Sequence, residues 1–264
     1  MIAPLAKLPD WLAIQFVWGR RVKSLLKLHN HPPNPKLEEA LQFLKGPDFI
    51  PVESSSAQLE FIDARNFRFP TPRPGEFAEN NVVYGRLYRC AERWQKRPVI
   101  ILLHGADGDP DYHFEFPLMA RQCNRAGLTA CRDARLSAAV LVAPGLDLNV
   151  FLSAAKQIVW RCLRAELLRQ QSACEALNRT TLNLVNARSC VPKENILLIE
   201  AIHDLFVDRK SMEALWHAWG RPDIWRLPHG HASKILSPGL TGRILRWLAP
   251  RLDAPAVRTG QTPH

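Results

Sequence analysis

The sequence has no long apolar run and no paired cysteine motif. No apolar stretch approaches the ~18–20 residues that a membrane-spanning helix needs. The 6 cysteines form no C-x-x-C pair and do not cluster with histidine, which argues against a zinc site and a dense disulfide framework. Asp107, Asp109 and Asp111 have the D-x-D-x-D spacing of a calcium loop, but no glutamate closes it. We therefore expect free buried thiols, a cytoplasmic protein, and no metal or other cofactor.

The chain also lacks a block of like charge, although its formal net charge is +10. Its 35 Lys and Arg residues are spread along the sequence and are densest at Arg20–Arg21 and at Arg132 and Arg135. Nucleic-acid binding segments usually gather such residues on one face or interleave them with aromatics. We expect a solvated, arginine-rich surface and no nucleic-acid partner.

The N-terminal region contains an apolar stretch, Trp11–Trp18, that is followed by four basic residues between positions 20 and 27. A signal peptide has the reverse order, with its positive charge before the apolar stretch. Asp10 is a plausible N-cap, so we predict a short helix that packs on the domain. Peripheral membrane contact by residues 11–27 is the alternative.

The remaining chain alternates between predicted strands and helices. With 264 residues, of which 47% are hydrophobic, it is long enough for one α/β domain with a sizeable core. Strands are predicted at 67–75 (an edge strand and turn), 82–89, 99–103, 138–144, 195–201 and 223–227, and helices at 10–28, 35–45, 116–131, 149–187, 209–219 and 239–249. This alternation predicts a mostly parallel sheet with helices on both faces.

The predicted organisation has three parts. Residues 1–66 form an N-terminal helical extension, residues 67–252 form the α/β domain, and residues 253–264 form a polar tail. Within the domain, the helical stretch 149–187 has the character of a lid-like insert.

Three apolar strands end in groups that could act on a substrate. V-I-I-L-L-H-G covers residues 99–105, I-L-L-I-E-A-I-H-D-L-F-V-D covers 196–208, and L-P-H-G-H-A-S covers 227–233. In open parallel sheets, ligands bind beyond the carboxyl ends of the strands. From about Val82 to Leu252, these motifs in this order resemble the α/β-hydrolase superfamily in its esterase or lipase-like form.

The resemblance implies an α/β-hydrolase fold and a small-molecule acyl substrate. Its site residues would be an oxyanion loop of His104, Gly105 and Ala106, the acid Asp204 and the base His231. Other interpretations of the motifs stay open. Asp204 could cap the following turn, with Asp208 as the acid, and His231 could be a packed structural residue, with His229 as the base.

The nucleophile of that family is missing from the chain. It sits in a G-x-S-x-G elbow, but no two of the 13 glycines lie four residues apart. Ser237 is a poor substitute because Pro238 removes the N–H that an oxyanion hole needs, and no strand is predicted before Cys131.

The spacing of the motifs predicts a deletion. Between Gly105 and Ala138 there is room for about one helix, so we expect the elbow and about two central strands to be absent. Residues 128–136 would then be the end of the helix that follows the elbow, and the 99–103 strand would pair with 139–143. Ester hydrolysis by this chain is therefore expected to be impaired. One alternative is ester hydrolysis by a water molecule that Asp204 and His231 activate. The other is a non-catalytic binding or scaffold role.

Overall fold

The computed structural model describes residues 3–15, 42, 59–71, 74, 78–90, 99–102, 116–125, 129–130, 138–144, 165, 171–180, 183–187, 189 and 191–252. These residues belong to two compact units. The first unit comprises Met1–Ile50 and Ala139–Pro238, and the second comprises Pro51–Ala138 and Gly239–His264. Each unit therefore combines two separate stretches of sequence.

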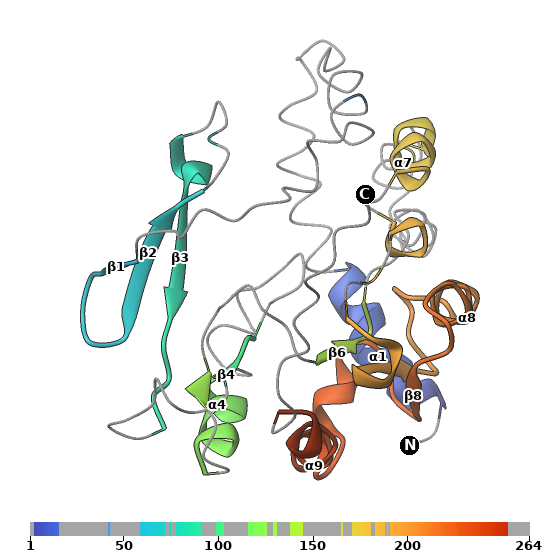
Figure 1. Cartoon of the computed structure of the whole chain (residues 1–264). Helices are drawn as coiled ribbons and strands as arrows, with labels where there is room; N and C mark the ends of the chain where they lie inside the picture. The colour runs from blue at the N-terminus through green and yellow to red at the C-terminus, as the bar shows by residue number, and fades with distance from the viewer. Residues whose placement is uncertain are drawn as a thin grey trace, which may run out of the picture. The chain divides into compact units, whose positions relative to one another are not determined.

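The first unit is built on a parallel sheet of three strands. Strands β6 (Ala139–Val142), β7 (Ile196–Ala201) and β8 (Asp223–Leu227) lie in the order β6-β7-β8. All six residues of the central strand β7 are buried, as its apolar run predicts for a strand that is covered on both faces. The predicted α/β fold class is confirmed by this parallel sheet and its helices (Figure 1).

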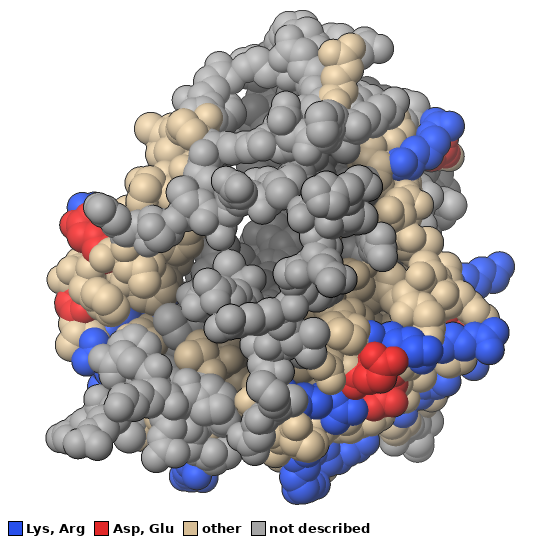
Figure 2. Space-filling view, in the orientation of Figure 1, with Lys and Arg blue, Asp and Glu red and all other residues tan. Residues whose placement is uncertain are grey.

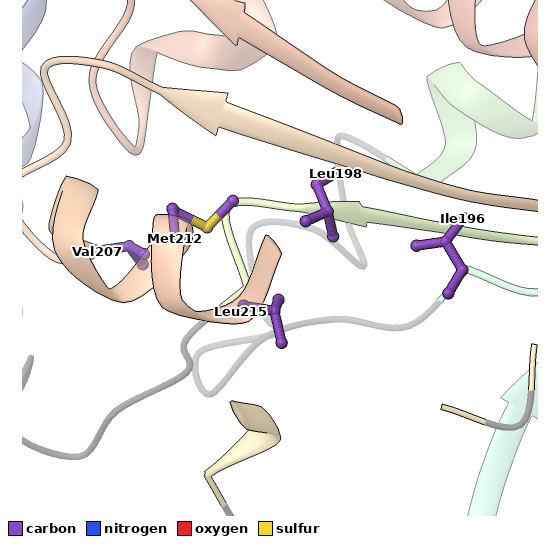
Figure 3. Close-up of a cluster of buried hydrophobic side chains, with 5 residues drawn as sticks. All are labelled: Ile196, Leu198, Val207, Met212 and Leu215. Carbon is purple, nitrogen blue, oxygen red and sulfur yellow. The ribbon is translucent and has the colours of Figure 1, made fainter. Parts of the chain in front are cut away.

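Helix α8 (Arg209–Ala218) covers β7 with an apolar face. Its Met212 and Leu215 form a buried cluster with Val207 and with Ile196 and Leu198 of the strand (Figure 3). Each fully buried side chain of this size stabilises the fold by about 1.5–3 kcal/mol.

The ends of α8 follow from local sequence. Asp208 is its N-cap, with a side chain that accepts a hydrogen bond from Ser211 N at 2.8 Å. The helix ends one residue before Trp219, and Gly220 follows with a φ of 77°, a left-handed conformation that glycine adopts at little cost. The predicted helix at 209–219 and its glycine stop are confirmed.

Helix α1 (Ala3–Ala13) corrects the prediction for the N-terminal region. Asp10 was expected to begin a helix, but it lies in the third turn of α1 and is fully buried. The N-cap interpretation is wrong because α1 starts seven residues earlier and turns Asp10 toward the protein interior. Most of the predicted helices at 10–28 and 35–45 lies outside the described residues.

The described residues of the first unit also form one further helix and three short 3-10 segments. Helix α7 (Gln171–Asn178) lies in the predicted helical stretch 149–187, most of which is not described. The 3-10 segments are η6 (Leu184–Asn186), η7 (Lys193–Asn195) and η8 (Ser233–Leu236).

The second unit contains an antiparallel sheet of three strands (Figure 1). Strands β1 (Glu60–Phe61), β2 (Asn66–Pro70) and β3 (Val82–Arg86) lie in the order β1-β2-β3, and the segment η3 (Ala78–Asn81) precedes β3. β2 was expected at a sheet edge, but it is central because β1 pairs with its first half. Pro70 is tolerated because it lies at the last position of the strand, beyond the residues that pair with β1.

A second strand pairing differs from the one that was expected to follow from the predicted deletion. Strand β4 (Val99–Ile100) pairs in parallel with β5 (Thr129–Ala130), and α4 (Phe116–Arg125) lies between them in sequence. The predicted pairing of 99–103 with 139–143 is not found in the described ranges, where β4 and β6 belong to different sheets. Residues 129–130 are a strand and not the end of a helix, so a strand does precede Cys131.

Helix α9 (Leu240–Leu252) completes the second unit and contacts α4. It matches the last predicted helix and buries Leu240, Ile244 and Leu248 at a helical spacing. None of the helices in the described ranges is long and apolar enough to cross a membrane.

The surface charges of the described residues are mixed. On the face shown in Figure 2, Lys and Arg side chains lie in separate groups, and Asp and Glu side chains lie beside some of them. In one contact, Arg226 Nε donates to Glu200 Oε2 at 2.8 Å, and Arg226 Nη2 donates to Glu213. Part of the positive charge is therefore paired within the protein. The absence of a nucleic-acid partner stays a prediction.

Candidate acid–base site

Asp204 lies just beyond the carboxyl end of β7, where its carboxylate closes a tight turn. Its Oδ1 accepts hydrogen bonds from Phe206 N at 2.7 Å and from Val207 N at 2.9 Å. This pattern is an Asx-type turn, in which a side chain satisfies the backbone N–H groups two and three residues on. The side chain of Asp204 is only 1% exposed, so these bonds fix the orientation of its second oxygen.

His231 lies beyond the carboxyl end of the neighbouring strand β8. Its Nδ1 is 2.8 Å from Asp204 Oδ2, and its ring packs against Phe206 with 5.0 Å between ring centroids. The loops after the two strands are also joined through their backbones, because His203 N donates to the carbonyl of His229 at 3.0 Å. Parallel pairing of β7 with β8 thus brings both side chains to one edge of the sheet.

This contact determines how the imidazole can act. Because the carboxylate of Asp204 can only accept, Nδ1 of a neutral His231 carries the proton and Nε2 has a free lone pair. No described residue makes a hydrogen bond to Nε2, and the side chain is 34% exposed. The ring is therefore partly open to solvent, and Nε2 is the nitrogen that accepts a proton in this tautomer.

A buried carboxylate from α1 holds both loops in place. Asp10, which is 0% exposed, accepts through Oδ2 from Leu205 N at 3.1 Å and from His231 N at 2.7 Å, and through Oδ1 from Ala232 N at 2.8 Å. Hydrogen bonds to an ionised acceptor are stronger than neutral ones. One side chain therefore fixes the backbone beside Asp204 and the backbone of His231.

Gly230 allows α1 to approach the loop this closely. A Cβ atom at this position would lie 2.3 Å from the carbonyl oxygen of Ala6 and 2.8 Å from Asp10 Oδ2, well inside contact distance. The same loop is anchored by Ser233, whose Oγ accepts from Gly230 N at 2.9 Å and donates to Ala6 O at 3.3 Å. The glycine of the sequence motif is thus required for packing against the helix.

Sequence reasoning missed the part that Asp10 plays. The signal was present, since Ala6, Asp10 and Ile14 follow one another at the i, i+4 spacing of a helix face, and all three are fully buried. A carboxylate on an apolar helical stripe needs hydrogen-bond donors, because an unpaired buried charge is very unfavourable. The sequence does not say that those donors lie 195 to 222 residues away.

The rival residues are placed differently. Asp208 uses its Oδ1 to cap α8. His229 is 7% exposed, its Nδ1 has no hydrogen-bond partner, and burial lowers the pKa of its imidazole. The structure therefore pairs Asp204 with His231. Their roles as acid and base stay a prediction.

The other predicted site residues lie outside the part of the chain that the structure describes. These are the oxyanion loop His104, Gly105 and Ala106, the aspartates at 107, 109 and 111, and Cys131. Ser237 is described and follows the 3-10 segment η8 rather than a strand, which agrees with its rejection as a nucleophile. Within the described ranges, no group of three or more His, Cys, Asp or Glu side chains could hold a metal ion.

Comparison with known proteins gives one short match. No family model matches the chain. Over 46 residues, it is 44% identical to the uncharacterized protein YdjC of Bacillus subtilis (strain 168). The match covers 17% of this chain and 40% of that protein, so the chain spans less than half the length of this relative.

Proposed function

We propose that this chain is an α/β-hydrolase-type protein of esterase or lipase-like ancestry that keeps an acid–base pair without an elbow serine. The observation that carries the proposal is the 2.8 Å contact between Asp204 and His231 at the ends of neighbouring parallel strands. The chain order of an apolar strand with His-Gly, then the acid, then the base supports the same ancestry.

The pair has the arrangement that general-base catalysis requires. Asp204 holds the imidazole in one tautomer and stabilises the cation that forms when Nε2 accepts a proton. Without a serine, the attacking group is water: its oxygen adds to the ester carbonyl while its proton moves to Nε2. The imidazolium then protonates the departing alkoxide, which leaves a carboxylic acid and an alcohol.

The backbone amides after His104 and Gly105 are the proposed partners of the developing oxyanion. Each such donor lowers the barrier by about 3 kcal/mol in known enzymes. Turnover is expected to be slow, because the reaction has no covalent intermediate to divide it into easier steps.

A non-catalytic binding or scaffold role is the second candidate. It is favoured by the lack of any G-x-S-x-G elbow in the whole sequence. The two candidates differ in whether His231 contributes to a measurable rate.

Hydrolysis of a short-chain p-nitrophenyl ester separates them. We expect a slow rate that falls by about tenfold or more in His231→Gln and in Asp204→Asn, since general-base catalysis contributes at least that much. His217→Gln is the matched control, because His217 is an exposed histidine on α8. A rate equal to that of the control in both site variants would leave only the binding role.

Covalent labelling identifies the attacking group. We expect a fluorophosphonate probe to label no serine, and a labelled serine would show that the nucleophile had been missed. Because β5 ends directly before Cys131, the variant Cys131→Ala belongs in the same assay. A rate that falls in this variant would replace the activated water with a thiolate.

A further inference from the structure

The second unit contains a cavity of about 580 Å³ that the acid–base site does not use. It is lined by the turn before β2, the chain around the end of β3, and α4. All of its lining residues fall within Pro51–Ala138. A volume of this size accepts a small organic molecule.

Four of the nine lining residues are arginines, and none of the described residues that line the cavity is Asp or Glu. The arginines are Arg65, Arg86, Arg89 and Arg121. Positive charges around one cavity attract an anion. Asp63, in the turn beside the cavity, offsets part of the charge of Arg86. Guanidinium groups also match the oxygens of phosphate and carboxylate groups in paired hydrogen bonds.

The backbone that presents these arginines is well held. Leu87 is buried, and its N donates to the carbonyl of Arg65 at 2.7 Å, which joins two of the lining segments. Asp63 Oδ1 accepts from Arg65 N at 2.7 Å in the preceding turn. Arg86 Nε donates to Asn66 Oδ1, a neutral acceptor, at 3.1 Å. A binding group on an ordered backbone loses little entropy when a ligand binds.

A side-chain hydrogen bond joins two walls of the cavity. Asn124 on α4 donates through Nδ2 to the carbonyl of Arg89 at 3.2 Å. Leu87, Tyr88 and Pro117 supply apolar wall surface for a carbon skeleton.

We propose that this cavity binds a small organic molecule with two or more negative charges on phosphate or carboxylate groups. The arginines neutralise its charge. Neither Asp204 nor His231 is among the residues that line this cavity.

Calorimetric titration of the full chain with inorganic pyrophosphate and with citrate, at constant ionic strength, tests this site. We expect saturable binding at one site, weakened about tenfold or more in Arg65→Gln/Arg121→Gln, because both removed groups hold the anion. Arg125→Gln is the control: it removes one positive charge from the helix that carries Arg121, but Arg125 does not line the cavity. Binding of pyrophosphate alone assigns a phosphate ligand, and binding of citrate alone assigns a carboxylate ligand.

Thermal unfolding of each variant guards against a simple loss of folding. We expect Arg65→Gln/Arg121→Gln to unfold as cooperatively as the wild type, because both side chains are exposed. Unchanged affinity in this folded double variant would overturn the proposal. No binding of either anion at millimolar concentration, or an equal loss in Arg125→Gln, would overturn it as well.

Discussion

Asp10 fixes the two loops that hold the proposed pair. Its two oxygens accept three backbone N–H groups that come from the loops after β7 and β8. Both loops hold a residue of the proposed pair, so the carboxylate of α1 acts as a positioning group. It reaches neither water nor substrate, since it is fully buried.

Removal of this carboxylate should destabilise the protein more than removal of an ordinary helix cap. We expect Asp10→Ala to lower the free energy of unfolding by about 3 kcal/mol or more, because it leaves three buried N–H groups without an acceptor. Asp10→Asn keeps one acceptor oxygen and should lose less. The control is Asp208→Ala, which removes an exposed N-cap and should cost about 1 kcal/mol. Urea unfolding measures all three, and equal losses in Asp10→Ala and Asp208→Ala would contradict the positioning role.

His229 should make stability depend on pH. Burial lowers the pKa of its imidazole below the ordinary value of 6.5, so the unfolded chain binds a proton more readily than the folded chain. The contribution of His229 to the free energy of unfolding is therefore fully present above pH 6.5 and is lost as the pH falls below that value.

The variant His229→Gln tests that dependence by urea unfolding at pH 7.5 and 5.5. We expect the wild type to lose more stability over this interval than His229→Gln does. His217→Gln, which changes an exposed histidine, should behave as the wild type does. The same loss in wild type and His229→Gln would show that His229 does not titrate in this way.

At the level of elements, the contact between α1 and the loop after β8 depends on the lack of a side chain at Gly230. The variant Gly230→Ala should destabilise the protein by about 1–3 kcal/mol, because a Cβ atom there overlaps the backbone of Ala6. Gly242→Ala is the matched control: it lies inside α9, its added Cβ meets only Arg246 at 3.8 Å, and alanine favours a helix by about 1 kcal/mol. Thermal unfolding compares the two, and an unchanged Tm in Gly230→Ala would mean that α1 does not pack as described.

The sequence predicted well those helices and strands whose ends are marked by residues within or directly beside the element. β8 spans Asp223–Leu227 as predicted, and α8 lies between an aspartate cap and a glycine stop that are both visible in the sequence. Strand pairing carries no such local signal. β5 was missed as the partner of β4 because it has only two residues, which is too short for a visible alternation.

At the scale of the whole molecule, the order of the strands made the acid–base pair predictable. Parallel neighbours end at the same sheet edge, so an aspartate after β7 and a histidine after β8 were expected to meet, and they do. The contacts of Asp10 were not predictable, since the helix and the loops are joined only after the chain folds. The compact units, each made of two distant stretches, were not predictable for the same reason.

The tautomer of His231 in the intact chain tests the central claim most directly. Nitrogen-15 NMR of the histidine-labelled protein, at a pH where the imidazoles are neutral, distinguishes a protonated from an unprotonated ring nitrogen. We predict that His231 carries its proton on Nδ1 in the wild type and that this preference is lost in Asp204→Asn, where an amide replaces the carboxylate. A proton on Nε2 in the wild type, or an identical His231 spectrum in Asp204→Asn, would contradict the pair on which the proposed chemistry depends.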